Sequence, residues 1–159
     1  MNISKNIFLV EDDEDDQIFF TECIDEIENA DLIGASSNGD EALRKLESIH
    51  VLPDIIFMDI NMPFMNGLEC LAEIIKHPRL KNIPVIMLST DTTQAGLAQK
   101  LGAKAFLKKS SDCQSLKTKM EELINRNFGS DDSFECRTFH FSILNNVHNV
   151  NSDALAFIG

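Results

Sequence analysis

The sequence predicts an α/β protein built on an open, doubly wound sheet of five parallel strands. Three observations indicate this class: five short apolar runs, helical patterns between them, and polar side chains where the runs end. The runs are short for helices, and their β-branched residues suit strands that are covered on both faces. The expected strands are Asn6–Val10, Leu32–Ser36, Asp54–Asp59, Val85–Ser89 and Ala105–Lys108.

Apolar residues at helical spacing follow each expected strand. The stripes expected to face the sheet are Phe20/Ile24/Ile27, Ala42/Leu43/Leu46/Ile49, Leu68/Leu71/Ile75, Leu97/Leu101 and Leu116/Met120/Leu123/Ile124. Asn38 with Glu41, and Asp91 with Gln94, are typical of a helix N-cap and its third helical residue. Right-handed crossovers between such units place a ligand site beyond the carboxyl ends of the strands.

The chain is strongly acidic, with a net charge of −12 and a pI of about 4.6. This charge disfavours nucleic acid and anionic membranes as partners, and it favours a cation or a protein with a basic face. The four cysteines are far apart and form no Cys-x-x-Cys pair, which favours free thiols over a disulfide framework or a zinc site. Because no signal-peptide pattern and no apolar stretch near ~20 residues is present, we expect a cytoplasmic protein.

We expect one domain over residues 4–127 and a C-terminal tail over residues 128–159. The last helical pattern stops near Asn127, and the polar segment 128–133 is typical of a linker. The remainder is too short for a second domain with its own core. Loose alternation in residues 138–144 suits either a short added strand or part of a mobile tail.

Acidic, hydroxyl and basic residues lie at the carboxyl ends of four of the expected strands. They are Glu11-Asp12-Asp13, Asp59, Ser89-Thr90 and Lys108-Lys109. Carboxylates that meet at one sheet edge repel one another, and a hard divalent cation such as Mg²⁺ offsets that repulsion. With Lys109 as a second positive charge, a phosphoryl group can approach Asp59, whose carboxylate then acts as the nucleophile. The combination predicts an aspartyl phosphate site.

These residues also match a known family. Over roughly residues 4–127 the chain resembles the receiver domain of two-component response regulators. The motifs are "IFLVEDDEDD" for the first strand with its acidic pair, "PDIIFMDINMPFMNG" for the phosphoacceptor strand and loop, "IPVIMLST" for the fourth strand and "GAKAFLKK" for the fifth. The resemblance implies a flavodoxin-like fold with strand order 2-1-3-4-5, the order of which a chemotaxis receiver is a familiar example.

The resemblance implies a role for each matching residue at the metal site. Asp59 would accept the phosphoryl group from a sensor histidine kinase or a histidine phosphotransfer protein. Mg²⁺ would be held by Asp12, by Glu11 through water, by Asp59 and by the backbone carbonyl of Asn61. We assign the acidic pair to Glu11 and Asp12, with Asp13 as a flanking acid, because Val10 is the last apolar residue of the strand.

The resemblance also implies how the protein would switch. Ser89 would hydrogen-bond the phosphoryl group, Lys109 would bridge to it, and Phe106 would turn inward as the aromatic switch. Phe106 is alternatively a simple core aromatic. One departure is Ser110, which stands where the family usually has a proline in a cis peptide. A cis bond before a residue other than proline costs ~2.5–4 kcal/mol, so we do not expect that geometry here.

The function expected from these features is that of a single-domain response regulator, not an enzyme, which signals to a downstream protein. The stretch "IIKHPRLKNIPVIMLST" resembles stand-alone receivers that partner phytochrome-like and other sensor kinases. One alternative is a phosphatase of the haloacid dehalogenase kind, but Asn61 stands where that family needs a second aspartate. Another is a receiver-like interaction module that works without phosphorylation. We also expect Asn61 and Asp91 to influence the lifetime of the phosphate.

Overall fold

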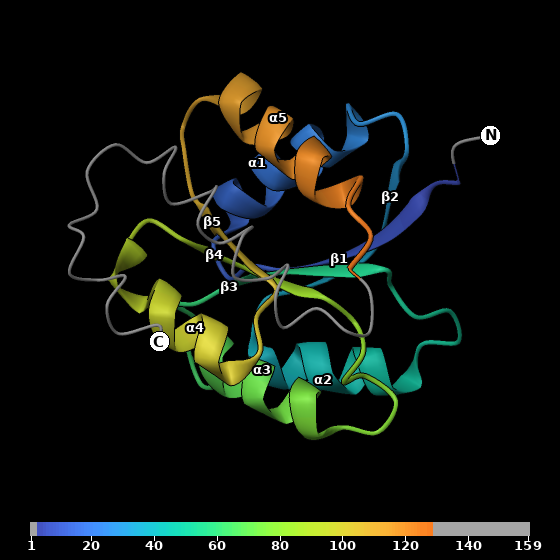
Figure 1. Ribbon diagram of the computed structural model, residues 1–159, viewed down its shortest axis with the longest axis vertical. Helices are drawn as coiled ribbons and strands as arrows, with labels where there is room; N and C mark the ends of the chain where they lie inside the picture. The colour runs from blue at the N-terminus through green and yellow to red at the C-terminus, as the bar shows by residue number, and fades with distance from the viewer. Residues whose placement is uncertain (1–2, 129–159) are drawn as a thin grey trace.

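The computed structural model describes residues 3–128, which form a five-stranded parallel sheet with helices on both faces (Figure 1). The strands are β1 (Lys5–Val10), β2 (Ala30–Ser36), β3 (Ile55–Asp59), β4 (Val85–Ser89) and β5 (Ala105–Lys108). The helices are α1 (Glu14–Asp25), α2 (Gly39–Ser48), α3 (Gly67–Lys76), α4 (Ala95–Leu101) and α5 (Cys113–Ile124), with a 3₁₀ turn at Thr92–Gln94. The strand order is β2-β1-β3-β4-β5, so the predicted fold class and the order implied by the resemblance are confirmed.

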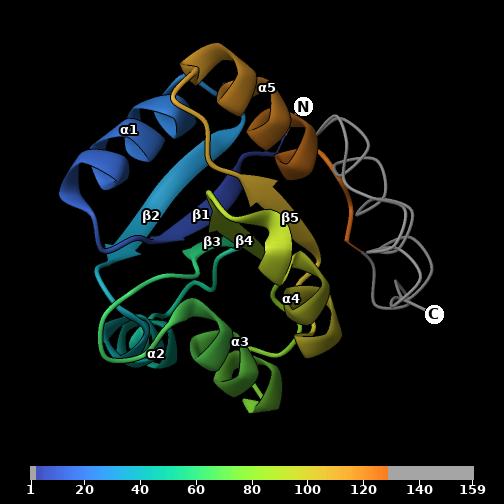
Figure 2. The ribbon, with the colours of Figure 1, turned by 90° about the vertical axis from the view of Figure 1, so that its left-hand side faces the viewer.

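Two apolar layers enclose the sheet. Helices α1 and α5 cover one face, and α2, α3 and α4 cover the other (Figures 1 and 2). Along β3, Ile55 and Phe57 join the cluster beneath α1 and α5, whereas Ile56 and Met58 join the cluster beneath the other three helices. β3 is therefore buried from both sides, which accounts for its uninterrupted apolar run.

Side-chain caps define where several helices begin. The side chain of Asn38 accepts a hydrogen bond from the Glu41 N–H, as expected for the start of α2. Asp91 also acts as a cap, but it begins the 3₁₀ turn and accepts from the Thr93 N–H at 2.9 Å. The apolar stripe expected for the following helix is wrong at Leu97, which is 50% exposed. After the 3₁₀ turn, α4 buries its two small residues, Ala95 and Ala98, against the core.

Backbone hydrogen bonds hold the residues that follow the strands. The N–H of Glu11 donates to the Ser36 carbonyl at 3.0 Å, and the N–H of Lys109 donates to the Ser89 carbonyl at 2.9 Å. The sheet pattern thus extends one residue beyond β1 and β5. Because parallel strands end at one edge, these bonds fix the polar residues on the same rim.

The start of α3 packs directly against the end of β3. The N–H of Gly67 donates to the Ile60 carbonyl at 2.8 Å. A Cβ atom at Gly67 would lie 2.0 Å from the carbonyl oxygen of Asp59, so a side chain at this position would clash with the backbone. Glycine is therefore required where α3 supports Asp59.

The expected C-terminal tail is described only at Phe128, which packs against the layer beneath α1 and α5. The rest of the tail, including the strand considered for residues 138–144, lies outside the described residues.

Candidate functional site

Three carboxylates converge at the carboxyl ends of β1 and β3. One oxygen from each of Glu11, Asp12 and Asp59 lies within 4.8 Å of the other two. Glu11 is 1% exposed and Asp59 is 4% exposed, whereas Asp12 is open to solvent. This set of close oxygen donors, buried on one side and open on the other, suits a hard divalent cation that keeps some of its water. The acidic pair and Asp59 therefore meet as expected.

The ammonium group of Lys109 enters the same cluster. Its Nζ atom lies 2.7 Å from Glu11 Oε2, 2.9 Å from Asp16 Oδ2 and 3.4 Å from Asp59 Oδ2. The Lys109 side chain is only 14% exposed, so its ion pairs with the buried Glu11 and Asp59 are weakly screened, whereas Asp16 is partly open to solvent. Lys109 thus links β1, β3 and α1 through one positive charge.

Burial shifts the ionisation of this cluster. It raises the pKa of Glu11 to about 7, and the charge of Asp59 adds to the shift while Lys109 opposes it. Burial also raises the pKa of Asp59, again against the effect of Lys109. For Lys109, burial alone would lower the pKa, but hydrogen bonds to Glu11 and Asp16 outweigh it and raise the pKa. The folded cluster therefore disfavours the charged forms of Glu11 and Asp59 despite Lys109, and an added cation would favour those charged forms.

The backbone after each strand orders the cluster further. The Asp13 N–H donates to Glu11 Oε1 at 3.2 Å, while the Asp13 side chain caps α1 by accepting from the Asp16 N–H. Asp13 is therefore engaged in capping α1, and its assignment as a flanking acid stays a prediction. The Asn61 N–H lies 3.4 Å from Asp59 Oδ1, which places Asn61 beside the predicted phosphoacceptor.

Ser89 and Phe106 occupy different surroundings. Ser89 is buried at the end of β4, and its Oγ accepts a hydrogen bond from the Asp91 N–H at 3.1 Å. Phe106 lies in β5 opposite Met87 and is buried in the core beneath α2, α3 and α4. Phe106 is thus a core aromatic in this structure, whereas its role as a switch stays a prediction. The peptide bond before Ser110 is trans, like every other in the described chain.

Sequence reasoning missed Asp16, which lies in the first turn of α1 and pairs with Lys109. The available signal was its position three residues after the N-cap Asp13, which fixes the first helical turn. Its pairing with Lys109 depends on a contact across 93 residues of sequence.

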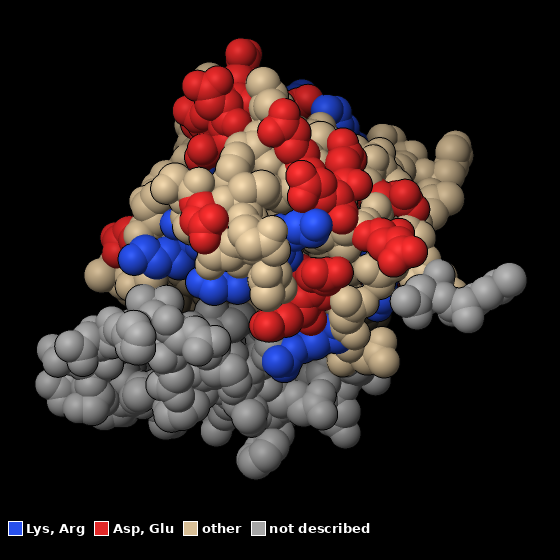
Figure 3. Space-filling view, turned by 90° about the horizontal axis from the view of Figure 1, so that it is seen from above, with Lys and Arg blue, Asp and Glu red and all other residues tan. Residues whose placement is uncertain are grey.

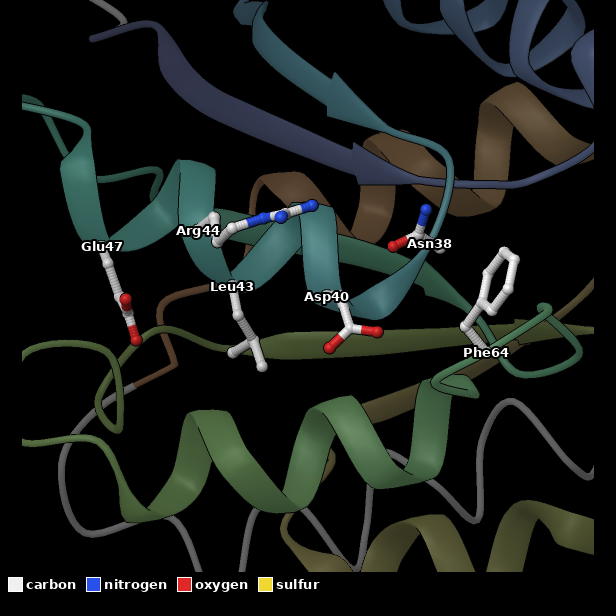
Figure 4. A pocket seen from close by; sticks show the side chains of 6 residues that line it. All are labelled: Asn38, Asp40, Leu43, Arg44, Glu47 and Phe64. Carbon is white, nitrogen blue, oxygen red and sulfur yellow. The ribbon is translucent and has the colours of Figure 1, made fainter.

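A separate groove lies between α2 and the β3–α3 loop, beside Phe64 (Figure 4). Its volume is about 490 Å³, and its lining residues are Asn38, Asp40, Leu43, Arg44, Glu47 and Phe64. Phe64 is 91% exposed and has a left-handed backbone with φ of 65°. No member of the carboxylate cluster lines this groove, so it is a neighbouring surface and not part of the cluster.

The fold and the site together define the class of protein. A family model described as the response regulator receiver domain matches residues 7–121. The chain belongs to this family, which confirms the resemblance found in the sequence. Within residues 3–128, no helix has the length and hydropathy needed to cross a bilayer.

Individual relatives agree with the family assignment. The chain is 34% identical over 115 residues to a protein-glutamate methylesterase/protein-glutamine glutaminase of Geobacillus kaustophilus, covering 69% of this chain but only 31% of that relative. The phosphorylated cyanobacterial phytochrome response regulator RcpA is 29% identical with a TM-score of 0.65, covering 76% of this chain and 91% of that one. The CheX–CheY–BeF3–Mg²⁺ complex of Borrelia burgdorferi matches with 28% identity and a TM-score of 0.68, covering 78% and 92%.

Proposed function

We propose that this protein accepts a phosphoryl group on Asp59 from a sensor histidine kinase or a histidine phosphotransfer protein, and that it then signals to a protein partner. The observation that carries this proposal is the placement of Asp59: a nearly buried carboxylate beside two further acids and 3.4 Å from the Lys109 ammonium. In such a setting the carboxylate is held in position, and nearby positive charge offsets the repulsion between it and the phosphoryl group that it attacks.

In the proposed transfer, an Asp59 carboxylate oxygen attacks the phosphorus atom of a phosphohistidine. The P–N bond breaks, its electron pair stays on the imidazole nitrogen, and that nitrogen takes up a proton. Lys109 can follow the phosphoryl oxygens because its Nζ is already 3.4 Å from Asp59 Oδ2. The Ser89 hydroxyl, at the end of the adjacent strand, would donate to another phosphoryl oxygen.

We propose Mg²⁺ as the cofactor, held by Glu11, Asp12, Asp59 and the backbone carbonyl of Asn61. The close carboxylates support this choice, as does the burial that raises the pKa of Glu11 and leaves its charged form in need of a counter-charge. When bound, the ion would neutralise the charge on the transferring phosphoryl group. The related CheX–CheY–BeF3–Mg²⁺ complex of Borrelia burgdorferi contains the same metal.

The proposed switch connects the site to α4 and β5. Phosphorylation adds strong acceptor oxygens and negative charge at Asp59, which would draw the Ser89 hydroxyl and Lys109 toward it. Ser89 would then give up its hydrogen bond with Asp91, which begins the turn before α4. Phe106, packed beneath α4, is the side chain that we propose to respond to that movement.

We further propose that residues 4–127 form the receiver domain and that it acts in the cytoplasm. The downstream partner would be a protein, since α1 presents exposed acids that disfavour nucleic acid (Figure 3).

Incubation with acetyl phosphate and Mg²⁺, followed by intact mass measurement, tests the central proposal. We expect a phosphate-sized mass gain that disappears in Asp59→Ala and when the metal is chelated. Asp40→Asn is the matched control, because Asp40 is an exposed acid of the separate groove. No gain in the unaltered protein would contradict phosphorylation and favour an interaction module that works without it.

A further inference from the structure

Two thiols from distant parts of the sequence meet between α1 and α5. Cys23 Sγ and Cys113 Sγ lie 3.1 Å apart. That separation is only about 1 Å longer than a disulfide bond. Both cysteines are free, as the sequence predicts, but their contact is not visible from the sequence because they are 90 residues apart.

The helices that carry these thiols are firmly packed together. Phe20 and Ile24 of α1 share one buried cluster with Leu116 and Met120 of α5. An ion pair between Lys117 Nζ and Glu26 Oε2, at 3.3 Å, joins the same two helices at the surface. The packing of α1 against α5 therefore keeps the two sulfurs close to each other.

The two thiols differ in their access to solvent. Cys23 is fully buried, and burial followed by the contact with Cys113 raises the pKa of the Cys23 thiol to about 12. Cys113 begins α5 and is partly exposed. An oxidant from solvent would therefore meet Cys113 first, and Cys23 would be the second thiol to react.

We propose that Cys23 and Cys113 form a reversible disulfide, with a low-molecular-weight disulfide as the oxidant. The Cys113 thiolate attacks one sulfur of the small disulfide, which forms a mixed disulfide and releases one small thiol. The Cys23 thiolate then attacks the Cys113 sulfur and releases the second small thiol. Two protein thiols are oxidised, the small disulfide is reduced to two thiols, and the two protons pass to those thiols.

The cross-link would connect two elements that flank the carboxylate cluster. Cys23 is in α1, which also carries Asp16, and Cys113 follows the segment that carries Lys109. The bond would close a long loop of the chain, which restricts the unfolded state more than the folded one. The oxidised protein should therefore unfold at a higher temperature than the reduced protein.

Oxidised glutathione is the probe for the test, applied to the full chain in a Cys136→Ser background so that the thiol outside the described residues does not take part. We expect the protein to lose two hydrogen atoms, and non-reducing tryptic digestion to join peptide 6–44 to peptide 110–117. The melting temperature should rise by roughly 5 °C or more and return to its original value after reduction.

Two variants distinguish a disulfide between Cys23 and Cys113 from the attachment of glutathione to single cysteines. Cys23→Ser should retain glutathione on Cys113 without any cross-link. Cys70→Ser should behave like its parent, because Cys70 is buried against the Gly39 carbonyl at 3.6 Å. Stable glutathione on the parent protein without a cross-link, or no reaction at all, would overturn the proposal.

Discussion

Lys109 forms an ion pair with Asp16 that is shorter than its approach to Asp59. The Nζ atom lies 2.9 Å from Asp16 Oδ2 and 3.4 Å from Asp59 Oδ2. Asp16 belongs to α1, so the helix competes with the predicted phosphoacceptor for the same positive charge. A phosphoryl group on Asp59 would add acceptor oxygens near Asp59 and none near Asp16, and so would draw Lys109 toward Asp59.

Removal of the Asp16 charge should release Lys109 toward Asp59. We expect Asp16→Asn to increase the rate of phosphorylation by acetyl phosphate roughly two- to tenfold, since a partly exposed ion pair contributes ~1 kcal/mol. Time-resolved intact mass measures the rate. Asp15→Asn is the control, because Asp15 is an exposed acid in the same helical turn. An unchanged or lower rate in Asp16→Asn would show that this competition does not limit transfer.

Loss of the Lys109 side chain should destabilise the protein in the absence of Mg²⁺. Lys109→Ala leaves the buried carboxylates of Glu11 and Asp59 without their counter-charge, and we expect the free energy of unfolding to fall by roughly 2–4 kcal/mol. Urea unfolding at pH 8 measures the change. Lys108→Ala, at an exposed neighbouring position, should change it by less than about 0.5 kcal/mol. Equal effects of the two substitutions would contradict the role of Lys109 as counter-charge.

Glu11 should make the metal-free protein less stable as the pH rises. The pKa of Glu11 is raised from 4.5 to about 7, so the folded state binds this proton more tightly than the unfolded state. The contribution of Glu11 to the free energy of unfolding is therefore fully present below about pH 4.5 and is lost as the pH rises through about 7. Without Mg²⁺ at pH 8, Glu11→Gln should raise the free energy of unfolding by about 2 kcal/mol.

The same substitution gives a clear check when urea unfolding is repeated at two pH values. The gain from Glu11→Gln should shrink at pH 5, where the native glutamate is itself protonated in the folded state. Glu14→Gln, at an exposed acid of α1, is the control and should show little gain at either pH. A Glu11→Gln protein that is less stable than the parent at pH 8 would contradict the raised pKa.

Two glycine substitutions should have opposite effects. Gly67→Ala would place a Cβ atom 2.0 Å from the Asp59 carbonyl oxygen, and we expect it to cost roughly 3 kcal/mol or more. Gly96→Ala lies inside α4 with open space around the added methyl group, and it should stabilise the protein by about 0.5–1 kcal/mol. Thermal unfolding of both variants measures the difference. A neutral Gly67→Ala would mean that α3 can move away from β3 without cost.

The sheet and most of the site could be predicted because both depend on local patterns. Apolar runs marked the strands, and the carboxyl ends of parallel strands necessarily share one edge, which brought Glu11 and Asp59 together. Asp16 could not be found this way, because an acid in a run of acids is usually solvated and its pairing depends on where the Lys109 side chain points. Leu97 was misassigned because the expected pattern there held only two apolar residues, whereas α4 buries the small residues Ala95 and Ala98 instead.

The hydrogen bond from the Asp91 N–H to Ser89 Oγ has a thermodynamic consequence for the proposed signal. If Ser89 must release that bond to reach a phosphoryl group, the turn before α4 and the phosphoryl group compete for the same hydroxyl. A partner that binds α4 in its displaced position would therefore favour the state in which Ser89 has left the Asp91 N–H. Linkage then requires the converse: such a partner would stabilise the phosphorylated form by the same free energy with which phosphorylation strengthens its own binding. The target would thus help to set the equilibrium population of the phosphorylated form to which it responds.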